Sequence, residues 1–538
     1  MFMSSFRTRQ APSPTGYLHL GTTRTLLFTK LFAVINNGVY YLRLEDTDRA
    51  RLNKVAAIGL VENLSMLGLS PDEGVNLDDK GSKDSYYGVS QTGNYGPYIQ
   101  SERLDIYHNY AQKLINAKLA YWSYLTVEEK QELQEIKSAT KKPIDYSKVC
   151  HQKYSQDQLY KSLQDGLDDP QKPALTYKLQ RDSQAVCDDL LVGQTSFNLK
   201  LEEDFVIMKS DGYPSYHLAH LVDDYLMKTS LVIRGQEWYP SIPKHITMFK
   251  DCFESGVLDR KYIEWTGTNP NYLHLPFVLK ETGTTKMSKR DGNVNMQDYL
   301  DKGYLPEAII NYLAFLGWNP GSEKEVYLER SDFENLDHGD RLVKLISNIS
   351  KEFSIEKLSK SPARFNIEKL NWFNREYIKL MTDAEWYDHA KTYLPQIDTQ
   401  DSTIQKALLL DKNRITTLSE FGSESECVFG WVKPSEEDIK WRKISLEESL
   451  SNLKEITNWV LSERYFNTQQ NESLATNTLN WESIIKKWLA DNNKDVGSYL
   501  WPLRVSLSGK QKSPSPFELL SILSKDEVKN RIGQIIPL

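Results

Sequence analysis

The chain has 538 residues, of which 40% are hydrophobic and 26% charged, and its formal net charge is −7. At roughly 150 residues per domain, this length predicts about three or four domains, and the composition excludes a mainly disordered chain. No continuous apolar run reaches the roughly 18 residues that a membrane span needs, so we expect a soluble protein with no membrane partner.

The negative net charge is at first sight unfavourable for binding nucleic acid, but the charge is unevenly distributed. Residues 341–380 carry more Lys and Arg than Asp and Glu, whereas residues 401–440 are acidic. Because salt screens each charge beyond about 10 Å, a locally basic surface can bind phosphate whatever the net charge. A solvated helix face is the simpler and more frequent explanation of such a stretch.

The four cysteines, Cys150, Cys187, Cys252 and Cys427, lie far apart and form no C-x-x-C pair. This spacing argues against a structural zinc site and against a disulfide framework, and it fits a reducing compartment. We therefore predict no metal site, and we expect the thiols to be packing residues.

The start of the chain predicts a strand–helix–strand unit. Residues 6–10 are expected to form a short strand, and residues 11–16, with two prolines and a glycine, a turn. Apolar side chains at helical spacing then predict a helix that begins near Thr22 and ends at residues 36–38. Residues 39–44 are β-rich. This order is typical of a nucleotide-binding α/β sheet.

Farther along the chain, irregular and regular segments alternate. Residues 72–97 are polar and rich in Gly, Ser, Asp and Tyr, so we expect a surface insertion there. Ser101 is expected to cap a helix with an apolar face. A second set of sheet elements is predicted in residues 203–234, and beyond about residue 340 the pattern is helical nearly to the end.

The predicted turn before the first helix contains His19-Leu20-Gly21-Thr22. Free backbone N–H groups and the helix dipole at such a position favour a phosphate, and Gly21 allows a ligand to approach closely. His19 can donate a hydrogen bond to a phosphate oxygen. Taken by itself, an H-x-G tripeptide is more often an ordinary turn histidine.

The segment Lys286-Met287-Ser288-Lys289-Arg290 follows a loop rich in Gly and Thr. Cations in such a loop can close over a triphosphate and neutralise the charge that develops on a leaving pyrophosphate. An ordinary basic surface loop is the alternative, and the more frequent one for this feature alone.

Two further polar clusters follow predicted strands. Glu45, Asp46 and Asp48 come just after a strand, where ligands of open α/β sheets bind, although a solvated acidic loop fits equally well. Arg234 ends another strand, and a guanidinium there is suited to bidentate binding of a carboxylate. A structural ion pair beside the aromatic residues of 213–224 is the alternative for Arg234.

Taken together, the order and spacing of these segments resemble the glutamyl-tRNA synthetases, a class I family of aminoacyl-tRNA synthetases. Their first (HIGH) signature resembles Arg9-Gln10-Ala11-Pro12-Ser13-Pro14-Thr15-Gly16-Tyr17-Leu18-His19-Leu20-Gly21-Thr22, and their KMSKS motif resembles residues 286–290. Further resemblances lie at residues 42–49, 216–219, 232–234, 365–378, 501–509 and 517–520. The resemblance therefore covers nearly the whole chain.

This resemblance implies an α/β fold with a split Rossmann catalytic domain, an inserted acceptor-binding subdomain and a mostly α-helical C-terminal anticodon-binding region. The implied halves of the Rossmann domain are residues 1–115 and 210–270. The implied acceptor-stem insertion is 116–209, the stem-contact region with the KMSKS-type loop is 271–370, and the anticodon-binding region is 371–538. The basic stretch after residue 341 would lie near the path of the tRNA backbone.

The implied activity is that of a glutamate–tRNA ligase, an enzyme of protein synthesis. Glutamate would be activated with ATP, with Mg²⁺ on the phosphates, and the glutamyl group would be transferred to the 3′-terminal adenosine of tRNA-Glu. The residues do not decide whether tRNA-Gln is also charged. We expect a monomer.

The family resemblance also implies which residues bind each substrate. For glutamate, Arg9 and Tyr216 would hold the γ-carboxylate, Ser13 and Glu45 the α-amino group, and Arg234 the α-carboxylate. The other expected glutamate-binding residues are Gln10, Ala11, His217, Leu218, Ala219 and His220. ATP would be bound by His19, Gly21, Glu237, Lys286 and Lys289, of which His19, Lys286 and Lys289 are the expected catalytic residues.

Three positions depart from the family pattern. Thr22 replaces the second histidine of the first signature, His220 stands where bacterial relatives commonly have Asn, and Gln236 replaces a frequent acidic residue. The His220 change puts one side-chain contact of the glutamate pocket in doubt. The insertion at 72–97 resembles fungal mitochondrial members, which implies the mitochondrial matrix, with the cytoplasm as the alternative location.

Three rival functions remain at this stage. A glutamyl-queuosine tRNA synthetase would lack the C-terminal half, and a glutaminyl-tRNA synthetase would have a C-terminal half rich in β-barrels, whereas this one is predicted to be helical. A non-catalytic tRNA-binding paralogue would not need the intact residues His19, Glu45 and Arg234.

Overall fold

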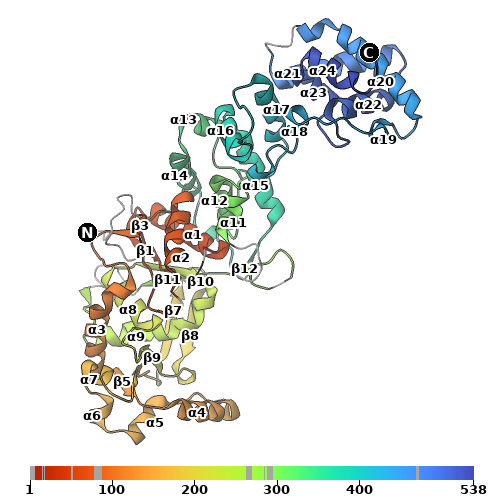
Figure 1. Ribbon diagram of the computed structural model, residues 1–538. Helices are drawn as coiled ribbons and strands as arrows, with labels where there is room; N and C mark the ends of the chain where they lie inside the picture. The colour runs from red at the N-terminus through yellow and green to blue at the C-terminus, as the bar shows by residue number, and fades with distance from the viewer. Residues whose placement is uncertain are drawn as a thin grey trace. The chain divides into compact units, whose positions relative to one another are not determined.

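The computed structural model describes residues 6–14, 16, 18–49, 52–77, 88–261, 270–283, 285–287, 295–467 and 472–538. The chain forms two compact units. Unit 1 consists of Met1–Leu300, Pro306–Leu328 and Leu336–Leu370, and unit 2 of Asp301–Leu305, Glu329–Asn335 and Asn371–Leu538. The described part of unit 2 is helical, whereas unit 1 combines sheets and helices (Figure 1).

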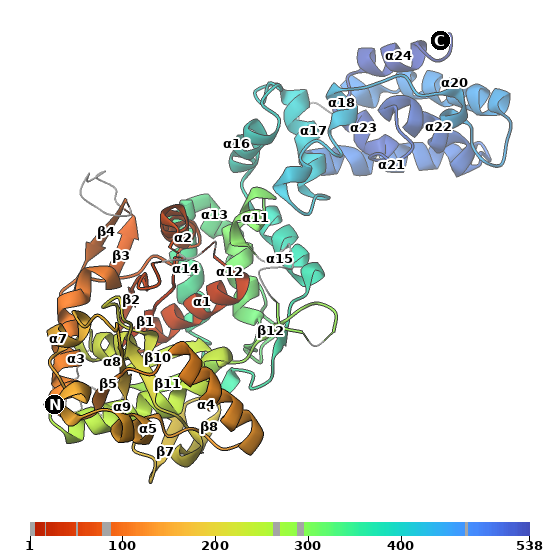
Figure 2. The same ribbon diagram turned by 60° about the horizontal axis from the view of Figure 1, so that its bottom comes forward.

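An eight-stranded mixed sheet forms the centre of unit 1 (Figure 2). Its strands are β1 Arg7–Gln10, β2 Val39–Leu42, β3 Glu73–Leu77, β4 Val89–Thr92, β7 Gln184–Asp189, β8 Gly193–Asn198, β10 Leu231–Gly235 and β11 Asn271–Leu275. They lie in the order β4-β3-β2-β1-β10-β11-β7-β8. All neighbouring pairs are parallel except the two edge pairs, β3 with β4 and β7 with β8.

Helices cover both faces of this sheet. They are α1 Leu20–Ile35 on one face and α8 Tyr216–Leu226 with α9 Ile242–Glu254 on the other. Because side chains alternate along a strand, neighbouring residues of β1 reach opposite layers. Gln10 donates to Thr29 of α1, whereas Arg9 pairs with Asp224 of α8. The α/β class expected from the sequence is confirmed.

The predicted strand–helix–strand unit is also confirmed, with one change at the helix start. The helix begins at Leu20, two residues before Thr22, because His19 supplies its cap. Its backbone geometry is extended, and its side chain accepts a hydrogen bond from the backbone N–H of Gly21.

The prediction of a surface insertion at residues 72–97 was wrong for two segments. β3 pairs parallel with β2, and β4 pairs antiparallel with β3, so both belong to the main sheet. Val75 and Val89 are buried, although the polar residues around them conceal this pattern. Residues 78–87 lie outside the described part of the chain.

Ser101 does not cap a helix, contrary to the prediction. It lies inside the 3-10 turn η1 Gln100–Arg103, after which α3 Leu104–Asn116 begins. The backbone N–H of Ser101 donates instead to Oδ1 of Asp46 over 2.7 Å. Asp46 is 1% exposed, and through this hydrogen bond it holds the turn in place. It was predicted as part of a candidate acidic site, but here it has a structural role.

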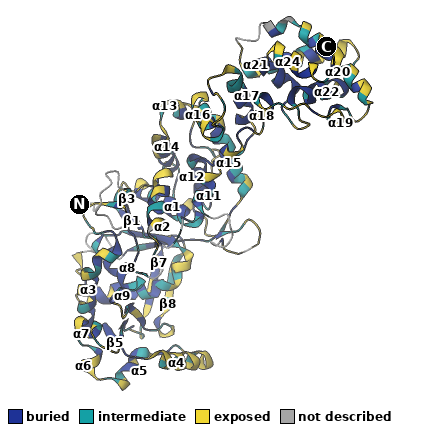
Figure 3. Ribbon diagram, in the orientation of Figure 1, coloured by how far each residue is buried: buried dark blue, intermediate teal, exposed yellow. Residues whose placement is uncertain are grey.

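The chain between α3 and α8 forms a smaller layer. An antiparallel sheet has the order β5-β6-β9, with β5 Ala120–Ser123, β6 Ala174–Tyr177 and β9 Phe205–Met208. The helices are α4 Val127–Thr140, α5 Tyr146–Lys153, α6 Gln156–Leu159 and α7 Leu163–Leu167. No residue of α4 is buried, as Figure 3 shows. β7 and β8 lie within the predicted acceptor-stem insertion, residues 116–209, but they join the main sheet. The division of the chain into five regions stays a prediction.

A further group of elements belongs to unit 1. Its elements are α2 Lys54–Met66, η2 Leu199–Leu201, η3 Gln236–Ser241, β12 Val278–Leu279, α11 Met296–Asp301, α12 Pro306–Phe315, α14 His338–Ser350, η4 Ile355–Lys357 and β13 Ala363–Arg364. β12 pairs parallel with β13. Arg341, the first residue of the basic stretch, is 5% exposed and bound to Glu307 over 2.9 Å, so its charge serves the fold.

Helices continue through the described part of unit 2, as predicted beyond about residue 340. They are α13 Arg330–Asn335, α16 Asp383–Tyr393, α17 Ser402–Lys412, η5 Leu418–Glu420, α18 Glu426–Phe429, α19 Glu436–Ile439, α20 Leu446–Ser462, η6 Arg464–Asn467, α21 Leu474–Asp491, α22 Val496–Ser508, α23 Pro516–Ile522 and α24 Lys525–Gly533. α15 Ile367–Leu380 spans the sequence boundary of the units. Trp481, Leu503 and Leu519 are among the buried residues of the unit 2 core.

The four cysteines are all buried and unpaired, which confirms their role in packing. In the described ranges, no helix has both the length and the apolar character of a membrane span. The same ranges contain no group of three or more His, Cys, Asp or Glu side chains placed to bind a metal ion.

Candidate active site

A cavity of about 590 Å³ lies in unit 1 and includes the carboxyl ends of β1 and β10. Ligands of parallel α/β sheets bind at such strand ends. The predicted site residues that line it are Arg9, Gln10, Ala11, Ser13, His19, Gly21, Glu45, Tyr216, Arg234, Glu237 and Lys286. Segments that are far apart in the sequence therefore share one pocket, as the sequence analysis required.

Four predicted residues of the described chain are not part of this lining. His217, Leu218, Ala219 and His220 lie in α8, behind the cavity wall, and the last three are buried. Their contacts are with other protein groups, so we assign them to the support of the wall. Lys289 lies outside the described residues.

Sequence reasoning missed several lining residues, of which Trp238 is the largest. Its ring lies 4.7 Å from that of Tyr216, and 44% of the residue is exposed. Its position directly after Glu237, a predicted ATP-binding residue, was the signal in the sequence that could have identified it. The lining segment 275–278 had no such signal.

Arg234 reaches the cavity with a guanidinium group that is held from two sides. Its Nε donates to Nε2 of His274 over 2.9 Å, and its Nη1 donates to the hydroxyl of Tyr216 over 2.7 Å. Arg234 is 5% exposed, yet its Nη2 has no hydrogen-bond partner among the residues that the structure describes. A buried unpaired donor costs about 1–3 kcal/mol, so Nη2 is suited to bind a ligand oxygen.

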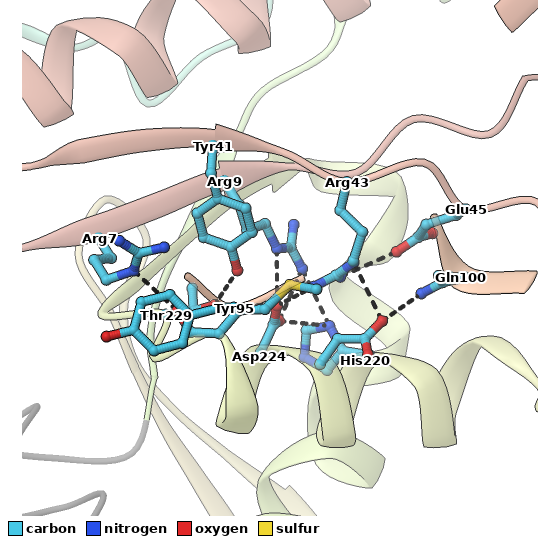
Figure 4. Close-up of polar contacts among 12 residues, drawn as sticks. Arg7, Arg9, Tyr41, Arg43, Glu45, Tyr95, Gln100, His220, Asp224 and Thr229 are labelled. Atoms are coloured by element: carbon cyan, nitrogen blue, oxygen red, sulfur yellow. Dashed lines mark hydrogen bonds and ion pairs between the residues drawn. The ribbon is translucent and has the colours of Figure 1, made fainter. Parts of the chain in front are cut away.

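Arg9 and Arg43 point from the sheet towards α8, where both bind Asp224 (Figure 4). Nε and Nη2 of Arg9 donate to the two carboxylate oxygens over 3.2 and 3.0 Å, and Nη1 of Arg43 donates over 2.8 Å. Burial alone would raise the pKa of Asp224, but the two guanidinium charges outweigh it and hold this pKa below its ordinary value. Asp224 is therefore ionised and holds Arg9 at the cavity wall.

Asp223, the neighbour of Asp224 in α8, binds a second set of donors. Its carboxylate accepts from Nε of Arg103 over 2.7 Å and from Gln100 and Tyr107 over 2.8 Å each, and it lies 3.4 Å from Nε of Arg43. Removing one partner of a buried ion pair leaves an uncompensated charge, which costs about 3–5 kcal/mol. The network therefore holds Arg43, which binds Glu45 of the cavity lining, in one arrangement.

Glu45 supplies a carboxylate to the cavity. Its Oε1 accepts from Nη2 of Arg43 over 3.2 Å. Burial raises the pKa of Glu45 above its ordinary value, although the charges of Arg43 and Arg9 oppose this. A ligand ammonium group would stabilise the charged form, so Glu45 is suited to bind an amine.

Three histidines, of which His220 and His245 are buried and His217 is partly exposed, form a cluster behind the wall. Nδ1 of His217 lies 3.0 Å from Nε2 of His245, and the rings of His220 and His245 stack with centroids 4.0 Å apart. Burial, helped by nearby cationic groups, lowers the pKa of His217 to about 4 and lowers the pKa values of His220 and His245 well below the ordinary value. The three rings are neutral near pH 7, so the positive charge in this region comes from arginines.

His19 is positioned by its role as the cap of α1. Its Nδ1 accepts the backbone N–H of Gly21 over 3.0 Å, so the neutral ring carries its proton on Nε2. That tautomer can donate to a phosphate. The backbone N–H of Gly21 is used by this cap, because the first turn of a helix needs a cap and His19 provides it.

Lys286 follows β12 and forms an ion pair with Glu237 over 2.8 Å. The two side chains are 46% and 43% exposed, and Nζ of Lys286 also lies 4.7 Å from the ring centroid of Phe277. An exposed ion pair contributes only about 0–1 kcal/mol, so an incoming phosphate can replace Glu237 as the partner of Lys286.

The chemistry of the cavity suits a zwitterionic ligand together with a phosphate ester. Arg9 and Arg234 match two carboxylates, and Glu45 matches an ammonium group. His19 and Lys286 match phosphate oxygens in the same cavity.

Comparisons with known proteins point in the same direction. Residues 5–372 match the family of tRNA synthetases class I (E and Q), catalytic domain, and residues 385–536 match the anticodon binding domain. The chain is 33% identical to the glutamate–tRNA ligase of Flavobacterium johnsoniae over 553 residues, with 98% of both chains covered. It is also 33% identical to that of Chloroherpeton thalassium, with 100% of this chain and 98% of the relative covered.

A solved structure extends this likeness to the fold. The crystal structure of a glutamate tRNA ligase from Elizabethkingia meningosepticum in complex with its amino acid matches with a TM-score of 0.77 and 28% identity, covering 98% of this chain and 99% of the other. The glutamate-tRNA synthetase of Elizabethkingia anophelis matches with a TM-score of 0.74. These matches do not favour the glutaminyl alternative. The chain is a class I tRNA synthetase of the E and Q family and belongs to its glutamate–tRNA ligases.

Proposed function

We propose that the chain activates L-glutamate with ATP in this cavity and transfers the glutamyl group to tRNA-Glu. One observation carries the proposal: a single pocket contains two buried arginines, a carboxylate, a histidine at a helix start and a lysine beside a loop. Those groups match the charges of glutamate and of a triphosphate.

For glutamate, Arg9 and Tyr216 bind the γ-carboxylate, Ser13 and Glu45 the α-amino group, and Arg234 the α-carboxylate. Support for Arg234 comes from its buried Nη2, which has no hydrogen-bond partner among the described residues. Support for Arg9 comes from Asp224, which fixes the guanidinium at the cavity wall.

For ATP, the phosphates lie near the start of α1. His19 donates from Nε2, and the ammonium group of Lys286 leaves Glu237 for the phosphates; Lys289 acts with it. Mg²⁺ is bound by the phosphate oxygens, the hard ligands that this ion prefers. Glu237 and Gly21 border the nucleotide.

The reaction has two steps and needs no covalent enzyme intermediate. An oxygen of the α-carboxylate attacks the α-phosphorus of ATP, and the bond to the β-phosphate breaks, which releases pyrophosphate. A ribose hydroxyl of the terminal adenosine, the 2′-OH by family resemblance, then attacks the activated carbonyl carbon and releases AMP. The protein contributes positioning and fixed charges.

Unit 2 supplies the binding surface for the anticodon of the tRNA, because residues 385–536 match an anticodon binding domain. We propose tRNA-Glu as the substrate and tRNA-Gln as a second one that the same pocket would serve, since the amino acid is glutamate in both cases. We further propose a monomer.

We propose the mitochondrial matrix as the location, with the cytoplasm as the alternative. The support is the residue pattern of 72–97, which resembles fungal mitochondrial members. A fluorescent fusion of the full chain, compared with a matrix marker in a fungal cell, tests this proposal; purely cytoplasmic fluorescence would contradict it.

The decisive test of the function is aminoacylation of separate tRNA-Glu and tRNA-Gln transcripts, each with labelled glutamate and with labelled glutamine. Glutamyl-tRNA-Glu is the expected product, and charging of tRNA-Gln with glutamate would add the second substrate. Charging with glutamine alone, or no charging at all, would contradict the proposal.

A further inference from the structure

The guanidinium of Arg234 is connected to two buried residues that neither the motifs nor the cavity lining include. Nε of Arg234 donates to Nε2 of His274 over 2.9 Å, and Nδ1 of His274 lies 2.6 Å from Oδ2 of Asp189. His274 and Asp189 are 1% and 2% exposed. The three side chains form a continuous buried chain that ends at the cavity.

Sheet topology explains why these residues meet. They come from the neighbouring strands β10, β11 and β7, and Arg234 is the register partner of His274. Register partners in a sheet present their side chains on the same face. The contact therefore depends on strand order, which joins residues far apart in the sequence.

The hydrogen-bond roles along this chain are determined by chemistry. An arginine can only donate, so Nε2 of His274 must be the acceptor and Nδ1 must carry the proton. That proton is donated to the carboxylate of Asp189. The carboxylate is itself held by the backbone N–H groups of Leu191 and Val192, over 2.9 and 2.8 Å, so it cannot rotate away.

The surroundings keep the ring of His274 neutral and in place. Burial lowers the pKa of His274, although Asp189 opposes this. Tyr272 stacks beside the ring at 6.1 Å, and Tyr239 meets it edge-on at 5.0 Å. A neutral ring with a fixed tautomer offers Arg234 a permanent acceptor.

We propose that Asp189 and His274 are positioning residues for glutamate binding: they orient Arg234 so that its Nη2 faces the α-carboxylate of the substrate. This inference rests on the proposed function, since it names that carboxylate as the ligand. Nε is bound to His274 and Nη1 to Tyr216, and these two hydrogen bonds fix the orientation of the planar guanidinium group. Nη2 is the nitrogen that remains for a ligand.

Two substitutions separate the parts of this chain. His274→Asn keeps a donor for Asp189 but cannot reach Nε of Arg234. Asp189→Asn keeps an acceptor for the backbone N–H groups but presents an amide N–H to His274, which favours the wrong tautomer. Asp188→Asn, on the exposed face of the same strand, is the matched control.

The test measures aminoacylation by the full chain with varied glutamate and with varied ATP. We expect both substitutions to raise the KM for glutamate roughly ten- to a hundredfold, the scale of outer partners that orient a ligand, with the KM for ATP and the melting temperature nearly unchanged. In an Arg234→Ala background, His274→Asn should add less than a twofold change, because the residue acts through Arg234.

Three outcomes would overturn the inference. One is a glutamate KM within twofold of the control for both variants. Another is an equal rise in the KM values for glutamate and ATP, and the third is a full additional loss in the Arg234→Ala background. Each leaves glutamate charging by the wild-type chain intact, whereas a wild-type chain that forms no glutamyl-tRNA overturns the proposed function as well.

Discussion

At the scale of single residues, most charges of the site and its surroundings are paired with protein groups. Asp224 binds Arg9 and Arg43, and Asp223 binds Arg103, so these buried charges neutralise one another. Arg234 differs, because its guanidinium has neutral partners and a buried Nη2 without one. An electrically unbalanced arginine in a pocket marks the place of a substrate anion.

Arg234→Ala should therefore impair glutamate binding more than any other function. Leaving a substrate carboxylate without its buried partner costs roughly 2–5 kcal/mol, so we expect the KM for glutamate to rise by about two orders of magnitude or more. The KM for ATP should change little. Steady-state aminoacylation measures both values, and unchanged glutamate kinetics would remove the assignment of Arg234.

Asp224→Asn should act mainly on folding. The substitution removes the anion shared by two buried arginines, which costs about 3–5 kcal/mol in the free energy of unfolding. Denaturation in urea measures this loss. The control is Asp211→Asn, an exposed aspartate, which should unfold like the wild type. If the Asp224 variant were as stable as the wild type, the two arginines would have other partners.

At the scale of elements, short segments at strand and helix ends bring the ligand groups together. β1 and β10 end beside the start of α1, and the segment after β12 carries Lys286. The ion pair of Lys286 with Glu237 is half-exposed, which leaves the lysine free to exchange partners.

Lys286→Ala should slow the formation of the adenylate far more than it weakens tRNA binding. A positioned charge that acts on the developing pyrophosphate typically contributes a factor of about 10²–10³ in rate. Single-turnover measurements of pyrophosphate release and a filter-binding assay with tRNA separate the two effects. Lys250→Ala, an exposed lysine of α9, is the control; equal losses in both assays would make Lys286 a general RNA contact.

Gly74 explains how β3 joins the sheet, and its substitution gives an element-scale test. Its φ is +102°, and an added Cβ would lie 2.1 Å from the carbonyl oxygen of Leu42 in β2. Gly74→Ala should therefore destabilise unit 1 by about 1–3 kcal/mol. Gly59→Ala, in the interior of α2 with open space around the added Cβ, should be neutral or slightly stabilising. Thermal denaturation compares them, and equal melting temperatures would contradict this role.

At the scale of the whole molecule, buried histidines connect stability to pH. His217, His220, His245 and His274 all have pKa values below the ordinary one, mainly because they are buried. In the unfolded chain, the same side chains bind protons at about pH 6.5. Between that pH and the lower folded pKa, the unfolded state holds more protons, so stability is present above pH 6.5 and falls as the pH decreases.

We therefore expect the free energy of unfolding to fall as the pH decreases below 6.5, by about 1.4 kcal/mol per pH unit for His217, with further losses from the other three histidines. For His217 the window extends down to about pH 4. Urea denaturation at pH 7.5, 6.0 and 5.0 measures the slope. His220→Asn removes one titrating group and should make the free energy of unfolding depend less steeply on pH. An unchanged slope would show that His220 is protonated in the folded protein.

Much of this molecule could be predicted from local sequence patterns. The strand–helix–strand unit at the start of the chain, the helical C-terminal half and the packing role of the cysteines follow from periodicity and composition, because those signals act over a few residues. Motif order and spacing were sufficient to predict the family and eleven of the residues that share the cavity. Local patterns failed at residues 72–97, where polar residues surround the buried Val75 and Val89.

Only the tertiary structure determined which of these residues face a ligand and which support those that do. His220 and Asp224 belong to the same predicted segment as Tyr216, yet they lie behind the wall, since the turn of α8 decides which side chains reach the cavity. The contact of Arg234 with His274 and Asp189 depends on strand order and register, which join positions far apart in the chain. The sequence by itself determined the family and the inventory of charges, because these depend on residue identity and spacing. Their pairing required the fold, because it depends on contacts across strands.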